Sequence, residues 1–199
     1  MRAPPTKIVM ASGNAGKLRE ISRLLDGLNI AVVAQTDLGV TDAEETGLTF
    51  AENSLIKARH AAEATGLPAI ADDSGLSVDA LNGAPGVFSA RFAGEHGDDQ
   101  ANNDKLLAML AGQVDRGAAF HCVATFVEPG GEPLVADGQW RGEILQAQQG
   151  SGGFGYDPLF YVPDCNCSSA ELDPEQKNAR SHRGQALRKL VELIKKQYS

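Results

Sequence analysis

Long apolar stretches are missing from this sequence. No run approaches the length needed to cross a membrane, and no stretch of the signal-peptide kind precedes the first predicted strand. We therefore expect a cytoplasmic protein with no membrane partner. Residues 1–6 are predicted to be a mobile N-terminal tail, and residues 7–199 are predicted to form a single domain.

Cysteine is scarce, with three in 199 residues, which fits reduced thiols in the cytoplasm. Cys122 lies in an apolar predicted strand, so we expect it in the core. Cys165 and Cys167 could be half of a metal site. Because the sequence has no second cluster of cysteine and histidine near them, we interpret them as free thiols of a loop.

Basic residues are outnumbered, with 18 Lys and Arg against 26 Asp and Glu and a net charge of −8. This balance, and the lack of a basic stripe, argue against nucleic acid or an acidic membrane surface as the main partner. A small phosphorylated substrate remains compatible, provided that a metal ion and a local basic cluster offset the acidic residues.

The most informative feature that is present is a turn between a predicted buried strand, residues 7–11, and a helix with apolar residues at helical spacing. Such a turn directs backbone N–H groups and the helix dipole toward a phosphate, and Lys17 adds a full charge. The Walker A spacing is absent, and a tight turn with a solvated lysine explains the pattern equally well. The turn consists of Ser12, Gly13, Asn14, Ala15, Gly16 and Lys17.

The remaining pattern predicts an α/β fold, with a mixed twisted sheet and flanking helices. Strands are expected at residues 30–34, 69–71, 118–127, 133–140 and 159–162, and a further stretch at 142–145 extends the sheet. Helices are expected at 50–65, 98–110 and 178–198. A Pro-Gly-Gly turn between the strands at 118–127 and 133–140 predicts an antiparallel hairpin.

Carboxylates gather at two places. Asp72 and Asp73 follow the predicted strand at 69–71, where α/β proteins place active sites, and Glu44 and Glu45 lie in a polar loop. Adjacent strand residues point to opposite faces, so the two aspartates need not act together. Carboxylate oxygens suit Mg²⁺. The alternatives are an ordinary aspartate-rich turn and a solvated glutamate pair. Lys57 is a candidate for the same site only if its helix face turns toward Asp73.

Aromatic and basic residues gather near the C-terminus. Phe154, Gly155, Tyr156 and Asp157 place two aromatic rings around a glycine, a plausible slot for a flat heterocycle. For at least one ring the alternative is an ordinary core position. Three hydrogen-bond donors lie nearby in the sequence and together indicate one binding edge: Lys177, His182 and Arg183.

Five motifs follow one another along the chain. They are Ser12-Gly13-Asn14-x-x-Lys17, Glu44-Glu45-Thr46-Gly47, Asp72-Asp73-Ser74-Gly75, Gly152-Gly153-Phe154-Gly155-Tyr156-Asp157 and Glu175-x-Lys177-Asn178-x-x-Ser181-His182-Arg183. Each is weak alone, but the ordered set is specific. It resembles the inosine triphosphate pyrophosphatase family, the bacterial dITP/XTP pyrophosphatases, over about residues 7–193.

The resemblance implies two lobes around a central cleft, a homodimer, and Mg²⁺-dependent hydrolysis of ITP, dITP or XTP to the monophosphate and pyrophosphate. It implies metal binding by Asp73 and by Glu44, with Glu45 as the other candidate, and Asp73 is also the implied general base. Lys17, with Lys57 as a further candidate, would stabilise the departing pyrophosphate. The residues implied to contact substrate are Ser12, Gly13, Asn14, Ala15, Gly16, Lys17, Ser74, Phe154, Gly155, Tyr156, Asp157, Lys177, His182 and Arg183.

Base selection has a physical interpretation. Hypoxanthine and xanthine carry a 6-oxo acceptor where adenine carries an amino donor, so donors such as His182 or Arg183 would be mismatched against ATP. This does not explain rejection of GTP. The alternatives are a pyrophosphatase for modified pyrimidine nucleotides, a general nucleotide phosphatase, and a nucleotide sensor without turnover.

Overall fold

The computed structural model describes residues 3–25 and 28–198, so residues 1 and 2 of the predicted tail lie outside the described part of the chain. The predicted α/β class is confirmed: a mixed sheet has seven strands in the order β2-β1-β3-β4-β5-β6-β7. The strands are β1 (Lys7–Met10), β2 (Ala31–Ala34), β3 (Ala69–Val78), β4 (Gly117–Val127), β5 (Leu134–Ile144), β6 (Phe160–Val162) and β7 (Cys167–Ser168).

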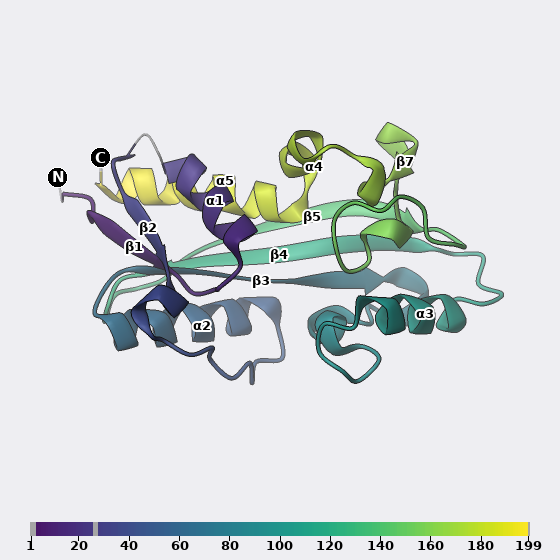
Figure 1. Ribbon diagram of the computed structural model, residues 1–199, viewed down its shortest axis with the longest axis horizontal. Coiled ribbons are helices and arrows are strands. Elements are labelled where there is room, and N and C mark those ends of the chain that lie inside the picture. The colour runs from purple at the N-terminus through teal and green to yellow at the C-terminus, as the bar shows by residue number, and fades with distance from the viewer. Residues whose placement is uncertain (1–2, 26–27, 199) are drawn as a thin grey trace. The chain divides into compact units, whose positions relative to one another are not determined.

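The helices are α1 (Ala15–Leu25), α2 (Phe50–Thr65), α3 (Asp99–Met109), α4 (Pro174–Arg180) and α5 (His182–Tyr198) (Figure 1). β1 pairs in parallel with β2 and β3, whereas β6 pairs antiparallel with β5 and β7. None of the described helices combines the length and apolar character needed to cross a membrane.

The chain divides into two compact units. The first comprises residues 1–73, 122–138 and 183–199, and the second comprises residues 74–121 and 139–182. From their bounds, β3, β4 and β5 each contribute residues to both units.

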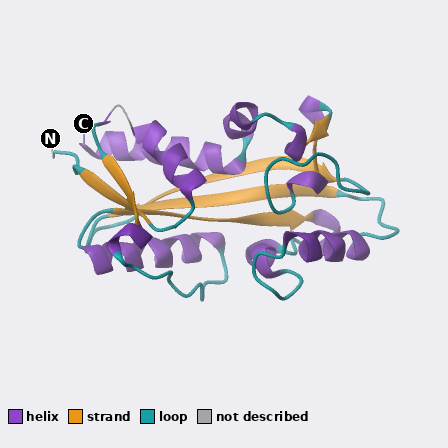
Figure 2. Cartoon of the chain, viewed as in Figure 1, coloured by secondary structure: helices purple, strands orange, loops and turns teal. Residues whose placement is uncertain are grey.

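In the first unit, the strand alternation of β3 separates two cores. Ile70 packs with apolar residues of α1 and α5, whereas Ala69 and Ala71 pack with the alanines of α2. Figure 2 shows α1 and α5 on one side of these strands and α2 on the other. Because successive side chains point to opposite faces, Asp72 continues the side of α1 and α5, and Asp73 continues the side of α2.

In the second unit, one core joins β3, α3, β4 and the segment around β6. Leu76 and Leu106 belong to it, together with an aromatic group in which Phe160 packs against Phe120 and Trp140. The centroid of the Phe160 ring lies 4.5 Å from that of Phe120 and 5.3 Å from that of Trp140. This core supports the segment that carries the predicted aromatic slot.

Two element predictions need correction. β3 does not end before Asp72 but continues to Val78, so the aspartate pair lies inside the strand and not at its end. The polar Asp-Asp-Ser-Gly segment has low strand propensity, and tertiary contacts override it. The predicted helix at 178–198 is two helices, because Ser181 has an extended ψ of 151° and interrupts the helical backbone.

Candidate active site

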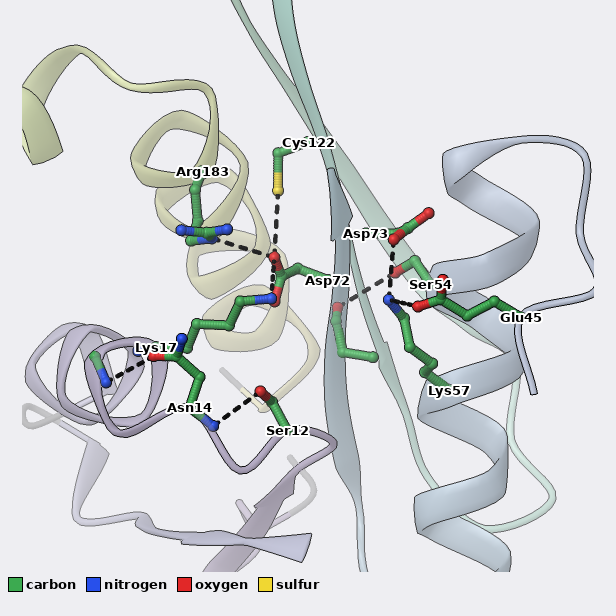
Figure 3. A network of polar contacts seen from close by, with 12 residues as sticks. Ser12, Asn14, Lys17, Glu45, Ser54, Lys57, Asp72, Asp73, Cys122 and Arg183 are labelled. Carbon is green, nitrogen blue, oxygen red and sulfur yellow. Dashed lines mark hydrogen bonds and ion pairs between the residues drawn. The ribbon is translucent and has the colours of Figure 1, made fainter. Parts of the chain in front are cut away.

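The N-terminal turn is closed by its own polar side chains (Figure 3). Ser12 Oγ accepts a hydrogen bond from the N–H of Asn14 (3.1 Å). Asn14 Oδ1 accepts from the N–H groups of Gly16 (2.8 Å) and Lys17 (3.1 Å), which is the geometry of an N-cap. The prediction that backbone N–H groups of the turn point freely at a ligand is therefore wrong for these three amides. The side chains of Ser12 and Asn14 accept the hydrogen bonds of these amides.

Lys17 and Arg183 converge on the buried carboxylate of Asp72, whose side chain is 1% exposed. Lys17 Nζ lies 2.8 Å from Oδ1, and Arg183 Nε donates to Oδ2 over 3.2 Å (Figure 3). Burial alone would raise the pKa of Asp72, but Lys17 and Arg183 outweigh it and hold that pKa well below its usual range. Burial likewise raises the pKa of the Cys122 thiol, whose Sγ lies 3.9 Å from Asp72 Oδ2, so Cys122 is a core residue as predicted.

The carboxylate of Asp72 is contacted by two cations, Lys17 and Arg183. Glu20 of α1 adds a second carboxylate nearby, and its pKa is raised by burial, partly offset by Arg183. Arg23 and Arg188 lie near Glu20. The ion pairs of Asp72 itself therefore carry one more positive than negative charge, which favours an anionic ligand.

On the other side of β3, the charge balance is reversed. Lys57 Nζ bridges Glu45 Oε1 (2.8 Å) and Asp73 Oδ1 (3.0 Å), so one ammonium serves two carboxylates (Figure 3). Burial raises the pKa of Asp73, and the Lys57 charge offsets this only in part, while Glu45 adds to it. Burial alone would lower the pKa of Lys57, but Asp73 and Glu45 raise it on balance. The helix face of Lys57 thus turns toward Asp73.

The donor set around Asp73 fits a hard cation. Its oxygens already surround an ammonium, and the cluster has one more negative than positive charge. Across the described chain, no three His, Cys, Asp or Glu side chains form a complete metal site, so two carboxylates are what the protein offers here. Mg²⁺ commonly binds one or two carboxylates and completes its shell with water and substrate phosphates. Of the two glutamate candidates, Glu45 shares Lys57 with Asp73, whereas Glu44 is exposed.

The loop that carries Glu45 is tied to the start of α2 by the side chains of Asn53 and Glu52. Asn53 Oδ1 accepts from the N–H of Gly47 (2.8 Å), and Glu52 Oε2 accepts from the N–H groups of Leu48 (2.7 Å) and Thr49 (3.0 Å). Thr49 and Glu52 form a capping box at the start of this helix. A Cβ on Gly47 would lie 2.7 Å from Asn53 Oδ1, so only glycine fits without a shift.

In the second unit, the two predicted aromatic residues have different roles. Phe154 is 61% exposed, whereas Tyr156 is 5% exposed and its hydroxyl donates to the backbone O of Ser89 (2.8 Å). Burial raises the pKa of Tyr156. The Tyr156 side chain therefore occupies the core position anticipated for one ring, and only the Phe154 ring is accessible for stacking.

Asp157 anchors the segment around Phe154. Its carboxylate accepts from the N–H of Phe154 (2.8 Å) and from Ser169 Oγ (2.8 Å), and it forms an ion pair with Lys177. Lys177 Nζ also lies 5.2 Å from the centroid of the Phe154 ring, a cation–π contact. Thus Phe154, Asp157 and Lys177 form one cluster, which links Lys177 of the predicted binding edge to the predicted aromatic segment.

The remaining predicted residues include His182, Ser74, Gly13 and Ala15. The His182 ring stacks on Phe120, with centroids 4.8 Å apart and an angle of 13° between the ring planes. Ser74 is half-buried in β3, Gly13 is exposed in the N-terminal turn, and Ala15 is the first residue of α1. Cys165 and Cys167 are free thiols, as predicted.

α3 supplies two contacts that the sequence did not reveal. Asp99 Oδ2 accepts from the N–H of Gly155 (2.6 Å), and Asn103 Nδ2 donates to the O of Gly155 (3.0 Å). Both residues belong to an ordinary polar helix sequence. The sequence feature that could have pointed to them is their spacing of four residues, which places them on the same face of α3.

Comparison with known proteins gives consistent matches over nearly the whole chain. The model of the Ham1 family matches residues 8–193. A protein named dITP/XTP pyrophosphatase from Pectobacterium atrosepticum is 55% identical over 193 residues, covering 95% of this chain and 98% of that protein. The structure of a HAM1 protein from Coxiella burnetii has a TM-score of 0.91 and 52% identity, covering 96% of this chain and 98% of that chain. The Ham1 protein of Staphylococcus aureus has a TM-score of 0.90 and 43% identity, covering 96% and 99% of the two chains.

Proposed function

The chain belongs to the Ham1 family, and from this premise we propose that it hydrolyses purine nucleoside triphosphates with non-standard bases, namely ITP, dITP and XTP, to the monophosphate and pyrophosphate. The name dITP/XTP pyrophosphatase carried by its relatives supports this substrate class. The observation that carries the proposal is the pair of charge clusters on neighbouring residues of β3: one has surplus cations, the other has surplus carboxylates.

The cationic cluster suits the phosphate groups. Lys17 and Arg183 are held in place by Asp72, so they need not be ordered when an anion arrives. Lys17 can stabilise negative charge on the departing pyrophosphate, with Lys57 as the second candidate, and the turn from Ser12 to Lys17 is proposed to contact the triphosphate. Because Asn14 caps α1, its own amide group is also a candidate ligand for a phosphate oxygen.

The carboxylate cluster suits the attack of water. Asp73 is proposed to orient a water molecule and accept its proton as the water oxygen bonds to the α-phosphorus and the bond to the pyrophosphate oxygen breaks. Asp73 and Glu45 would hold Mg²⁺, with Glu44 as the alternative ligand. When bound, Mg²⁺ supplies charge neutralisation of the phosphates and lowers the pKa of a bound water. Lys57 keeps the two carboxylates together.

Recognition of the base is proposed for residues of the second unit and the start of α5. The exposed Phe154 ring offers a stacking face, and Gly155, Tyr156 and Asp157 complete the segment that presents it. Lys177 and His182 supply donors, and Ser74 supplies a hydroxyl. Arg183, the other donor named for the base from the sequence, is paired with Asp72 beside Lys17 and is assigned here to the cationic cluster. Donors directed at a 6-oxo acceptor would favour hypoxanthine and xanthine over adenine, because a buried mismatch is costly.

We also propose Mg²⁺ as the cofactor, a cytoplasmic location and a homodimer. The two oxygen-donor carboxylates support Mg²⁺ over softer metals. The location and the dimer rest on the resemblance to the family. Sedimentation velocity tests the dimer, since a pair of chains has twice the monomer mass of 20.9 kDa.

One assay tests the activity. The protein is incubated with ITP, dITP, XTP, GTP, ATP and dUTP in Mg²⁺, and pyrophosphate and orthophosphate are measured separately. We expect pyrophosphate from the first three substrates and its loss on addition of EDTA. Orthophosphate as the main product would favour a general phosphatase. Binding of ITP without product would favour a sensor, and turnover of dUTP alone would favour a pyrimidine nucleotide enzyme.

A further inference from the structure

An exposed aromatic ring, that of Phe154, is carried by a backbone whose polar groups are all bonded. Phe154 is 61% exposed, yet its N–H donates to Asp157 Oδ2 (2.8 Å) and its O accepts from the N–H of Asp157 (3.3 Å). The next residue, Gly155, has a φ of 61° and is held by α3 through both of its backbone polar groups. Because the polar groups of this backbone are engaged, the backbone has few conformations to lose when a ligand stacks on the ring.

Two residues of α3, Asp99 and Asn103, hold the backbone of Gly155. Asp99 lies at the start of the helix and accepts the Gly155 N–H over 2.6 Å. Asn103, four residues later and 2% exposed, donates to the Gly155 O over 3.0 Å. Residues at this spacing are neighbours on a helix, so one helix holds both the N–H and the O of Gly155.

A buried asparagine in a helix interior is unusual and needs a reason. Asparagine has low helix propensity, and its buried amide must find partners. The neighbouring Asn102 is also buried and accepts from the N–H of Ala93 (2.7 Å). The polar face of α3 thus serves to hold adjacent loops, and through Asn103 it holds the loop that carries Phe154.

We propose that Asp99 and Asn103 are positioning residues for base recognition: they fix the Phe154–Gly155 backbone so that the Phe154 ring is ready to stack on a purine. This inference rests on the proposed function, because it needs a purine ligand. It goes beyond that function by assigning base affinity to two residues of α3 that do not themselves contact the base. The turn at Ser12 to Lys17, which is proposed to contact the triphosphate, belongs to the other unit.

The test compares a ligand that has a base with one that lacks it. Inhibition constants for inosine monophosphate and for inorganic pyrophosphate are measured with the full chain and with Asp99→Ala and Asn103→Leu. We expect each variant to weaken inosine monophosphate about tenfold, the order of a lost stacking contact. The inhibition constant for pyrophosphate should stay within about twofold. Equal weakening of both ligands, or no change in either, would overturn the proposal.

Two further variants separate positioning from general damage to α3. Asp99→Asn keeps an oxygen acceptor for the Gly155 N–H and should restore inosine monophosphate binding. Asp98→Ala removes the N-cap that accepts from the N–H of Ala101 (3.0 Å) at the same end of the helix, and it should leave both inhibition constants unchanged. Asp99 is exposed, so Asp99→Ala keeps the test available if Asn103→Leu disturbs the buried interior.

A double-mutant cycle links Asn103 to the Phe154 ring. Phe154→Ala should weaken inosine monophosphate by itself, and Asn103→Leu should then add less than about twofold, because the group that it positions is already gone. Multiplying effects would contradict the proposal. If Phe154→Ala has no effect, the assignment of Phe154 as the base platform fails, and the inference fails with it. If Phe154→Ala weakens binding but Asp99→Ala and Asn103→Leu do not, only the inference fails.

Discussion

Asp72 and Asp73 are neighbours in the sequence, but their carboxyl groups lie in opposite charge environments. Asp72 is paired with Lys17 and Arg183, and its pKa is held low by them against the effect of burial. Asp73 shares the one ammonium of Lys57 with Glu45, and burial raises its pKa. Asp72, which is balanced by two cations, is suited to hold those cations in place. Asp73, which shares one cation with Glu45, is available to bind a metal ion or a proton.

Asp73→Asn tests the general base. The substitution keeps the shape of the side chain but cannot accept a proton, so pyrophosphate release from ITP should fall about 10²–10⁴-fold. Because burial disfavours the charged form of Asp73 in the folded protein, the free energy of unfolding should not fall. Urea denaturation and a pyrophosphate assay measure the two quantities. A folded variant that still releases substantial pyrophosphate would exclude Asp73 as the base.

Lys57→Met tests the cation site without relying on turnover. Removal of the ammonium leaves Glu45 and Asp73 facing each other, so the variant should unfold at a lower temperature than the native protein. Added Mg²⁺ should then raise the unfolding temperature more in the variant than in the native protein, because binding to the folded state alone stabilises it. Lys189→Met, which removes an exposed lysine of α5, is the control. An equal response of the two variants to Mg²⁺ would contradict the assignment.

At the scale of single elements, the start of α2 is the best defined part of the site. The capping box of Thr49 and Glu52 starts the helix, and Asn53 reaches back to the N–H of Gly47, so the helix and the loop with Glu45 form one unit. Lys57 follows one turn later and faces Asp73. The position of the candidate metal loop therefore depends on how closely Gly47 approaches the helix.

Gly47→Ala tests this close approach. An added Cβ would lie 2.6 Å from the Cβ of Glu52 and 2.7 Å from Asn53 Oδ1, so the loop must move. We expect a loss of about 1–3 kcal/mol in the free energy of unfolding, and a higher Mg²⁺ concentration for half-maximal activity. Thr46→Ala changes the exposed neighbouring residue and should have neither effect. If Gly47→Ala leaves the Mg²⁺ concentration for half-maximal activity unchanged, the loop that carries Glu45 does not hold the metal ion.

The sequence predicts elements better than it predicts contacts between them. The bounds of α2 and α3 are predicted to within one residue, and the hairpin of β4 and β5 follows from its turn. The full length of β3 could not be predicted, because its polar middle is stabilised by Lys17 and Arg183, which come from distant parts of the chain. The hydrogen bonds from Asp99 and Asn103 to Gly155 could not be predicted either, because they also join distant parts of the chain.

At the scale of the whole molecule, the two compact units share three strands. β3, β4 and β5 each run through residues of both units. Independent unfolding of one unit would have to stop inside these strands. We therefore expect one cooperative transition, which is also what a single domain at residues 7–199 requires.

Leu190→Ala tests the cooperativity of the molecule. Leu190 is fully buried in the core of the first unit, so its truncation should cost about 2–5 kcal/mol. The single tryptophan, Trp140, is 7% exposed and belongs to the second unit, so its fluorescence reports unfolding there. If the shared strands couple the two units, the urea midpoint seen by Trp140 should fall by the same amount as the midpoint seen by far-ultraviolet circular dichroism. A Trp140 transition that stays at its native midpoint, while circular dichroism shows an earlier one, would mean that the units unfold separately.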